Sequence, residues 1–379
     1  MQPLLRKRIA AWACAVLVCT EPALATWSIV VVNTKTGEVC VGSATCVGKI
    51  DLERYVPVIV PGKGGGAAQS VPDVLGNLRI EMWNGFKAGT SPQEILSILA
   101  TKPAHHSHQF GIVDMLHDPV TFSGHSTGAA SNGVAGISGD LRYAIQGNVL
   151  AGYEIVFAGE AALLGTPGDL GQKVMAAMEA VRALGGDGRC SCMPSDPTAC
   201  GVPPPGFVKS AHAGFVALAR VGDNPGNCNT NKGCASGLYY MNLEFLGTGP
   251  DPDPVLALQQ MYDSWRASKI GQPDHVLTQV LASKKTLAPD GVDRARVTLV
   301  LRDLDERRIE HGGHAIQLDR LPGSDGATQA TRVLDRGDGT YAFELAAVAR
   351  AGTDRWRVRV GSGGGLVTLS PDLEVRVGR

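Results

Sequence analysis

Residues 26–45 read TWSIVVVNTKTGEVCVGSAT, and this stretch decides the fold. Residues 27–33 form a β-branched run that predicts a strand buried on both faces, and residues 34–37 form a turn. Residues 38–45 predict a second strand. We therefore expect an antiparallel hairpin at the start of a layered domain.

The residues before this hairpin have the pattern of a secretory signal peptide. Residues 6–8 are basic, residues 9–19 are apolar but too few to span a bilayer, and Ala23 and Ala25 suit a signal-peptidase site. We interpret residues 1–25 as a removed signal, which predicts a secreted or periplasmic protein. A lipoprotein signal is a weaker alternative, because the cysteine that ends the apolar run follows a valine where a small residue is expected.

Cleavage after Ala25 would make Thr26 the first residue of the mature protein. An N-terminal threonine holds a hydroxyl nucleophile and, in its α-amine with a pKa of about 7.7 to 8.0, a general base. Every secreted protein must begin with some residue, so Thr26 by itself adds little to a hydrolase interpretation. Other residues have to support it.

The composition is that of a globular protein, with 44% hydrophobic residues, 19% charged residues and a formal net charge of −1. It lacks the basic excess that nucleic acid or an anionic membrane surface would require. No segment after the signal predicts a membrane span. No serine-hydrolase elbow or phosphate loop is present, and we predict no cofactor. The histidines at 105, 106 and 108 could hold a metal loosely, but they are more typical of a solvated loop, so we predict no metal site.

Seven cysteines follow the signal: Cys40, Cys46, Cys190, Cys192, Cys200, Cys228 and Cys234. In an oxidising compartment we expect disulfides among the five late ones. A zinc cluster is the alternative, although no pair has the spacing that structural zinc sites favour. Cys40 and Cys46 cannot bridge each other, because six residues of strand separate them by about 20 Å.

Hydrophobic periodicity and turn signals place the later elements. Ser91 and Glu94 form a capping box with proline between them, which predicts a helix whose buried residues are Ile95, Ile98 and Leu99. The remaining expected helices cover residues 71–82, 153–164, 170–184 and 255–265. The expected strands cover residues 110–115, 120–122, 143–146, 213–221 and 238–246. Such an order predicts an α+β domain in which helices cover antiparallel sheets.

The pattern of polar and apolar residues changes near residue 290. Residues 269–289 resemble a linker, and residues 290–379 show short alternating strands with turn signals and no helical pattern. We predict an all-β immunoglobulin-like sandwich there, which resembles the invasin-type modules of bacteria. Such modules attach or position something, so docking of a partner through this domain is expected.

Five pieces of the chain together resemble a known family. They are TWSIV at 26–30, QFGIVD at 109–114, YAIQGNVLAG at 143–152, GGDGR at 185–189 and DPDPV at 251–255. This pattern is similar to an uncharacterised bacterial family of unknown function assigned to the N-terminal-nucleophile (Ntn) hydrolase superfamily. The resemblance covers residues 26–268 and implies a four-layer αββα fold with the nucleophile at the end of the first strand. Gly188 replaces an arginine of the family pattern, and residues 190–206 resemble an insertion.

Amide hydrolysis at such a site needs a nucleophile, a base and donors for the oxyanion. Thr26 would supply the first two, and the side-chain amide of Asn148 would face the oxyanion. Asp187 and Arg189 would orient the amine or bind a substrate carboxylate. The plainer alternative is that Asn148 caps a turn and the charged pair ties a loop to the sheet. Weaker candidates for substrate binding are Gly147, which precedes Asn148, together with Ser43 and Gln69.

The sequence therefore predicts a secreted amidohydrolase that acts on a small-molecule or peptide amide. The alternative is a catalytically inactive Ntn-fold module that binds a ligand or partner. The substrate, the disulfide connectivity and the formation of a homo-oligomer stay open at this stage.

Overall fold

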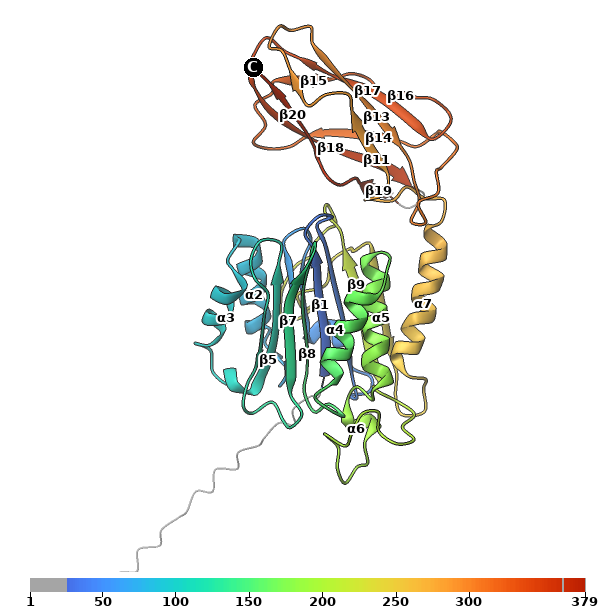
Figure 1. Cartoon of the computed structure of the whole chain (residues 1–379). Coiled ribbons are helices and arrows are strands. Elements are labelled where there is room, and N and C mark those ends of the chain that lie inside the picture. The colour runs from blue at the N-terminus through green and yellow to red at the C-terminus, as the bar shows by residue number, and fades with distance from the viewer. Residues whose placement is uncertain (1–25, 363–364, 379) are drawn as a thin grey trace, which may run out of the picture.

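The computed structural model describes residues 26–362 and 365–378. Figure 1 shows two bodies joined end to end, which we call the α+β body (β1 to α7) and the sandwich (β11 to β20). The predicted α+β class is confirmed, since helices and sheets are layered in the first body. The signal-peptide prediction concerns residues 1–25, which lie outside the described residues.

The larger sheet of the α+β body has six antiparallel strands in the order β10-β9-β2-β1-β8-β7. The predicted hairpin forms the centre of this sheet, while β7 has no counterpart among the strands predicted from the sequence. The strands are β1 (Thr26–Asn33), β2 (Glu38–Thr45), β7 (Asn132–Ser138), β8 (Leu141–Gly147), β9 (Ala213–Ala219) and β10 (Met241–Leu246).

A second sheet of four antiparallel strands packs on one face of the first, in the order β3-β4-β5-β6. Its strands are β3 (Pro57–Val60), β4 (Gly64–Ser70), β5 (His108–Asp114) and β6 (Val120–Ser123). Alternation along β1 sends Val30 and Val32 into the space between the two sheets, and Ile29 and Val31 toward the helices on the opposite face. Both faces of β1 are therefore buried, as its sequence predicts.

Glycines in β4 allow this close packing. A Cβ on Gly65 would lie 2.8 Å from Val39 Cγ1, and one on Gly64 would lie 2.7 Å from Phe86 Cδ1. Residues with side chains would push apart the sheets and the helix that covers them. The sequence pattern indicated a turn at residues 61–66, so β4 was not predicted.

Helices cover the outer faces of the two sheets, as the ribbon shows for α4, α5 and α7 on one side and α2 and α3 on the other (Figure 1). The long helices are α2 (Asn77–Ala88), α3 (Pro92–Leu99), α4 (Ile155–Gly165), α5 (Leu170–Ala183) and α7 (Pro254–Lys269). Shorter helical segments are α1 (Leu52–Tyr55), α6 (Gly188–Ser191) and the 3-10 turn η1 (His105–Ser107). The body is thus layered helix, sheet, sheet, helix.

Two details of the predicted helices were tested by the structure. The capping box is confirmed, because Glu94 N donates to Ser91 Oγ and the Glu94 carboxylate accepts from Ser91 N. Ile98 is 42% exposed and so is not the buried position that we expected. The helix predicted from residue 71 begins only at Asn77, and Val74 is exposed in the preceding loop.

The sandwich consists of two sheets around a core of its own. One sheet has the order β11-β13-β17-β15 with β16 beside β17, and the other has the order β12-β20-β18-β14 with β19 beside β18. The strands are β11 (Gln279–Ala282), β12 (Thr286–Leu287), β13 (Arg294–Val300), β14 (Ile316–Arg320), β15 (Thr328–Ala330), β16 (Leu334–Asp335), β17 (Thr340–Ala347), β18 (Gly352–Ser362), β19 (Gly365–Thr368) and β20 (Leu373–Val377). Strands β11 and β12 lie within residues 269–289, which we expected to be a linker.

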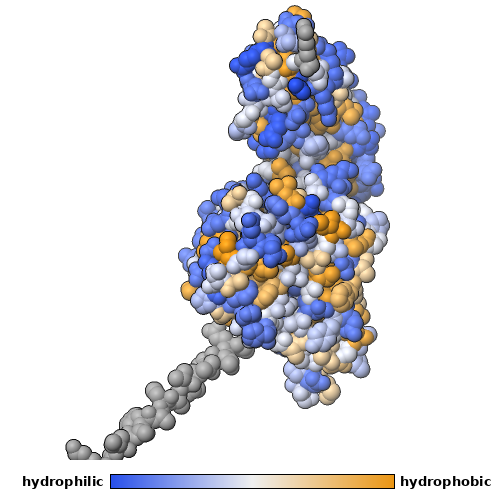
Figure 2. Space-filling view, turned by 60° about the vertical axis from the view of Figure 1, so that its left-hand side comes forward, coloured by the Kyte–Doolittle hydropathy of each residue, from blue (hydrophilic) through white to orange (hydrophobic). Residues whose placement is uncertain are grey.

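A buried ionic cluster lies where the two bodies meet. Arg220 Nε donates to Glu38 Oε1 at 2.9 Å, and its Nη2 donates to Asp274 Oδ2 at 2.9 Å. His275 lies beside this cluster, with Nε2 3.2 Å from Thr36 O. Arg220 is 5% exposed and Asp274 is 2% exposed. The space-filling view shows that the outline of the molecule narrows where the two bodies meet (Figure 2).

The described residues form three disulfides, Cys46–Cys190, Cys192–Cys200 and Cys228–Cys234. The prediction of disulfides among the five late cysteines is confirmed, as is the prediction that Cys40 and Cys46 do not bridge. Disulfides of this number indicate an oxidising compartment. Across the described ranges, no helix combines the length and the apolarity needed to cross a membrane.

Candidate active site

Thr26 begins β1 and is 1% exposed. It lies on the same face of β1 as Val30, between the two sheets, at the end of the body away from the sandwich. Its backbone nitrogen donates to Asn148 Oδ1 at 3.1 Å, and its Oγ1 lies 3.4 Å from Thr45 Oγ1. Its carbonyl oxygen accepts from Gln69 Nε2 at 2.6 Å and from Asn148 N at 3.1 Å. Both backbone polar groups of Thr26 and its hydroxyl therefore have fixed neighbours.

Sheet register brings Asn148 to Thr26. Trp27 pairs with Gly147, so the residue after Gly147 lies beside the residue before Trp27. The Asn148 amide nitrogen donates to Thr127 O at 3.0 Å and to Ser70 Oγ at 3.3 Å, which fixes the amide plane. The predicted proximity of Thr26 and Asn148 is thus present, with the amide oxygen toward the Thr26 nitrogen.

Asp187 and Arg189 form the predicted pair beside the same site. Arg189 Nη2 donates to Asp187 Oδ2 at 2.7 Å, and Arg189 Nε donates to Asp187 Oδ1 at 3.1 Å. Asp187 is fully buried and also accepts from Cys46 N at 2.7 Å. Burial raises the pKa of the Asp187 carboxyl above its usual range, and the hydrogen bonds and charge of Arg189 oppose that rise. The Arg189 side chain is 26% exposed, so it can still meet a ligand.

Thr45 connects this pair to Thr26, and the sequence analysis did not single it out. Its hydroxyl lies 3.4 Å from both Thr26 Oγ1 and Arg189 Nη2. Thr26 and Thr45 are register partners because the hairpin pairs Asn33 with Glu38. Counting back from the expected turn at residues 34–37 would therefore have placed Thr45 opposite Thr26.

The weaker candidates Ser43, Gln69 and Gly147 have different positions. Gln69 holds the Thr26 carbonyl and also donates to Gln109 Oε1 at 2.8 Å. Ser43 donates to Trp27 O at 2.7 Å and lies two register pairs further along the hairpin from Thr26. Gly147 is buried, and a Cβ there would lie 2.7 Å from Leu150 Cδ2. Gln69 therefore contacts Thr26, whereas the other two contact neighbouring residues.

Strained backbone surrounds the site. Ser70, which contacts Asn148, has φ 82°, and Val149, which follows Asn148, has φ 53°. A positive φ is unusual for a β-branched residue such as valine. Backbone strain of this kind gathers at functional sites in many proteins, where the surrounding structure holds it in place.

A chain of hydrogen bonds connects Asp187 to the N-terminus of α7. Asp253, the N-cap residue of α7, accepts from Ser210 N at 2.7 Å and from Ser210 Oγ at 2.8 Å. Ser210 O in turn accepts from Asp187 N at 3.0 Å. The 251–255 and 185–189 pieces of the family pattern thus meet through Ser210, although they are distant in sequence.

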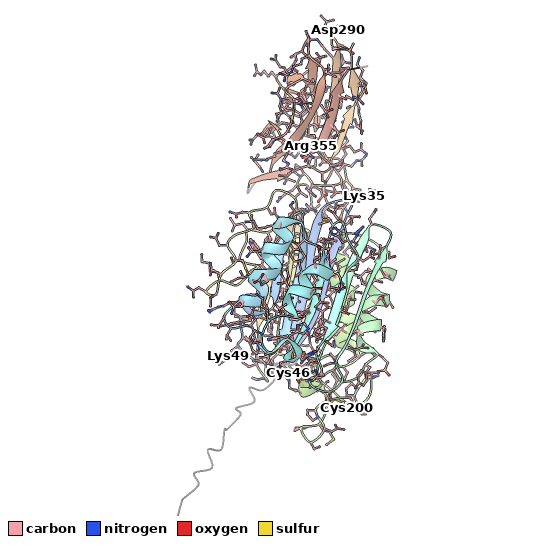
Figure 3. All side chains as sticks on the ribbon, turned by 90° about the vertical axis from the view of Figure 1, so that its left-hand side faces the viewer. Lys35, Cys46, Lys49, Cys200, Asp290 and Arg355 are labelled. Carbon is pink, nitrogen blue, oxygen red and sulfur yellow. A yellow bond between two sulfur atoms is a disulfide. The ribbon has the colours of Figure 1, made fainter. Side chains whose placement is uncertain are left out.

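A cleft opens beside Thr26. A small cavity lined by Thr26, Gln69 and Ser70 shares Ile50, Tyr55 and Pro72 with a larger cleft of about 480 Å³. The remaining residues that line the larger cleft are Val47, Lys49, Asp51, Arg54 and Val74. Figure 3 shows Cys46 and Lys49 at the end of the α+β body opposite Lys35 and the sandwich.

The described residues bring Cys46, Cys190 and His212 close enough to resemble a metal site. The two cysteines form a disulfide, so they offer no thiolate to a metal. The expectation of a solvated loop at His105 and His108 was wrong, because they are 8% and 5% exposed. The His105 ring stacks on Phe122 with the ring centroids 4.2 Å apart.

The body and its site define a layered α+β protein with a buried threonine hydroxyl at the start of the central strand. Residues 26–193 match the model of a protein family described as "Family of unknown function (DUF1028)". The predicted resemblance to a family of unknown function is confirmed over these residues.

Three solved structures illustrate the similarity of this chain to known folds. A crystal structure from Silicibacter pomeroyi that carries the same family description is 16% identical, covers 63% of this chain and 88% of its own, and has a TM-score of 0.45. The Yersinia pseudotuberculosis adhesin InvE is 21% identical over 27% of this chain and 26% of its own, with a TM-score of 0.22. The Escherichia coli adhesin FdeC is 14% identical over 44% and 40% of the two chains, with a TM-score of 0.23. No curated protein matched the sequence.

Proposed function

We propose that the mature protein is a secreted N-terminal-threonine amidohydrolase with the four-layer αββα fold of the Ntn-hydrolase superfamily. The observation that carries the proposal is the position of the Thr26 nitrogen, 3.1 Å from Asn148 Oδ1, on a residue whose hydroxyl faces Thr45, which in turn lies 3.4 Å from Arg189 Nη2. Removal of residues 1–25 converts that nitrogen into an amine with an ordinary pKa of about 8. The amine is then a base held in place beside its own hydroxyl.

The proposed reaction has two halves. Thr26 Oγ1 bonds to the carbonyl carbon of the amide while its proton passes to the α-amine. The carbon–nitrogen bond then breaks, the leaving amine takes that proton, and an ester to Thr26 remains. Water attacks the ester, the α-amine accepts the water proton and returns it to Oγ1, and the acid is released.

We assign the remaining roles in this reaction to Asn148, Arg189 and Asp187. Asn148 accepts from the α-amine and so positions the base, which is a different role from the oxyanion donor expected from the sequence. Arg189 is a charged donor beside the Thr26–Thr45 hydroxyl pair, and we assign it to the oxyanion or to a substrate carboxylate. Asp187 is a positioning residue, because it holds the guanidinium of Arg189.

The test is covalent labelling of Thr26 by an electrophilic β-lactone probe after N-terminal sequencing has shown residue 26 to be first. Labelling should disappear in Thr26→Ala and persist in part in Thr26→Ser, which keeps both the hydroxyl and the amine. A protein with one alanine added before Thr26 is the matched control, because it keeps the hydroxyl but has an amide in place of the amine. Equal labelling of the extended and native proteins would refute the N-terminal-nucleophile mechanism.

The second candidate function is an inactive module that binds a ligand in the cleft while the sandwich docks a partner. Thr26 is 1% exposed in the full chain. If cleavage occurs elsewhere, Thr26 stays buried and has no free amine to act as a base, which favours this alternative. A different mature N-terminus, or no labelling of a protein that begins at Thr26, would support it.

A further inference from the structure

The cleft beside Thr26 carries two cationic side chains. Lys49 is exposed on the loop after β2, and Arg54 is half-buried in α1. Within the described residues, neither side chain forms an ion pair with a carboxylate. The Arg54 guanidinium donates to Thr230 O at 3.4 Å, and its Nε is buried with no hydrogen-bond partner in the described part of the chain. The cations are thus available to a ligand.

The backbone holds both cations at the cleft. Lys49 has φ 58°, a left-handed conformation that non-glycine residues seldom adopt, and its N–H donates to Gly247 O at 3.0 Å. Arg54 is held by its own backbone, because Arg54 N donates to Asp51 Oδ1 at 2.9 Å. The Arg54 guanidinium carbon lies 5.1 Å from the centre of the Tyr55 ring, which orients the side chain along the cleft.

The rest of the cleft defines what else the ligand contains. Ile50, Tyr55, Pro72 and Val74 supply an apolar wall. The one carboxylate in the lining, Asp51, already accepts from a backbone N–H, and the two cations outnumber it. An extended apolar group that ends in an anion matches this lining, and a neutral or cationic group does not.

We infer that the cleft selects amides that bear a carboxylate, such as N-acyl amino acids or the C-terminal end of a peptide. This inference rests on the proposed function, because it assigns the cleft to the substrate of Thr26. Arginine recognises a carboxylate through two parallel hydrogen bonds, and Lys49 adds a point charge. The apolar wall would hold the side chain that lies between the scissile amide and the carboxylate.

The experiment compares two probes on the mature protein that begins at Thr26 and continues to the C-terminus. The β-lactone probes are identical except that one ends in a carboxylate and the other in a carboxamide. The carboxylate probe should label Thr26 about tenfold faster, and the preference should shrink as salt is added. Arg54→Gln and Lys49→Gln should each reduce the preference several-fold, whereas Arg54→Lys should keep part of it.

The matched controls are Lys35→Gln and Arg355→Gln. Both residues are exposed, and Figure 3 shows them far from Lys49, so neither substitution should change the preference. Thermal melting of each variant establishes that it is folded, and Arg54→Lys serves this purpose if Arg54→Gln unfolds.

The outcomes separate the two proposals. Equal labelling by both probes would overturn the carboxylate inference and leave the amidohydrolase proposal standing. A carboxylate preference that survives both cleft substitutions but disappears in Arg189→Gln would also overturn it, since the anion would then bind at Arg189. Labelling by neither probe would overturn the proposed function together with the inference.

Discussion

Loss of the Cys46–Cys190 disulfide should destabilise the α+β body far more than loss of Cys228–Cys234. The perturbation is a pair of double variants, Cys46→Ser with Cys190→Ser and Cys228→Ser with Cys234→Ser. The first disulfide closes a separation of 144 residues and the second closes 6. Chain-entropy reasoning assigns about 5 kcal/mol to a loop of the first size and about 2 kcal/mol to one of the second. We therefore expect a difference of about 3 kcal/mol between the two variants.

The first disulfide also borders the candidate site. Cys46 N donates to Asp187 Oδ2, and Cys190 N donates to Asp187 O at 3.0 Å. Its loss should therefore loosen Asp187 and Arg189 and slow the labelling of Thr26. Cys234 pairs with Val58 of β3 and packs in the core beneath α2 and α3, so removal of the Cys228–Cys234 disulfide should leave labelling unchanged.

Urea unfolding followed by circular dichroism at 222 nm is the suitable assay, because the described helices all lie in the α+β body. The midpoint and slope give the free energy of unfolding for each variant and for the wild type. Equal losses in the two double variants, or a larger loss for Cys228 with Cys234, would refute the argument from loop size.

Two further predictions concern other parts of the chain. The carboxyls of Glu53 and Glu244 have pKa values raised by burial to about 7, so the native state holds protons that the unfolded state has already lost. The contribution of these carboxyls to the free energy of unfolding is present below about pH 4.5 and is lost as the pH rises through 7. Glu244→Gln should therefore stabilise the protein by about 1 kcal/mol at pH 8 and by nearly nothing at pH 4.5. Urea unfolding at both pH values would test this expectation. Truncation after Ile270 should leave a folded α+β body that melts at a lower temperature than a matched truncation after Thr278, because only the longer chain keeps Asp274 on Arg220. Aggregation of both truncated proteins would contradict independent folding of the α+β body.

The sequence predicted well those elements whose signals are local. The hairpin of β1 and β2 has a β-branched run, a turn and a second run, and the structure has both strands there. The helix after Ser91 has a capping box, in which sequence neighbours satisfy each other's hydrogen bonds. In both cases the residues that determine the structure lie within a few positions of one another.

Elements that depend on distant contacts were missed. Gly64 and Gly65 form a strand because Phe86 and Val39 leave no room for side chains, and nothing in the glycine run itself indicates this. The partner of Cys46 lies 144 residues away. Arg54 lines the cleft beside Thr26 because α1 packs against β2 and β9, which are distant from each other in sequence. Spacing along the chain cannot reveal such pairs.

The position of Thr26 limits what the sandwich can contribute. Strand β1 extends from Thr26 at the site to Asn33 near the junction, a length of about 23 Å at about 3.3 Å per residue. The carbonyl of Thr36, in the turn after Asn33, accepts from Ser370 Oγ of the sandwich at 3.3 Å and lies 3.2 Å from Nε2 of His275, so the sandwich is anchored at the far end of the same hairpin. A side chain of the sandwich therefore cannot reach the hydroxyl of Thr26 in this arrangement. A partner bound by the sandwich can therefore affect Thr26 only by changing the hairpin or by determining where the whole protein is located.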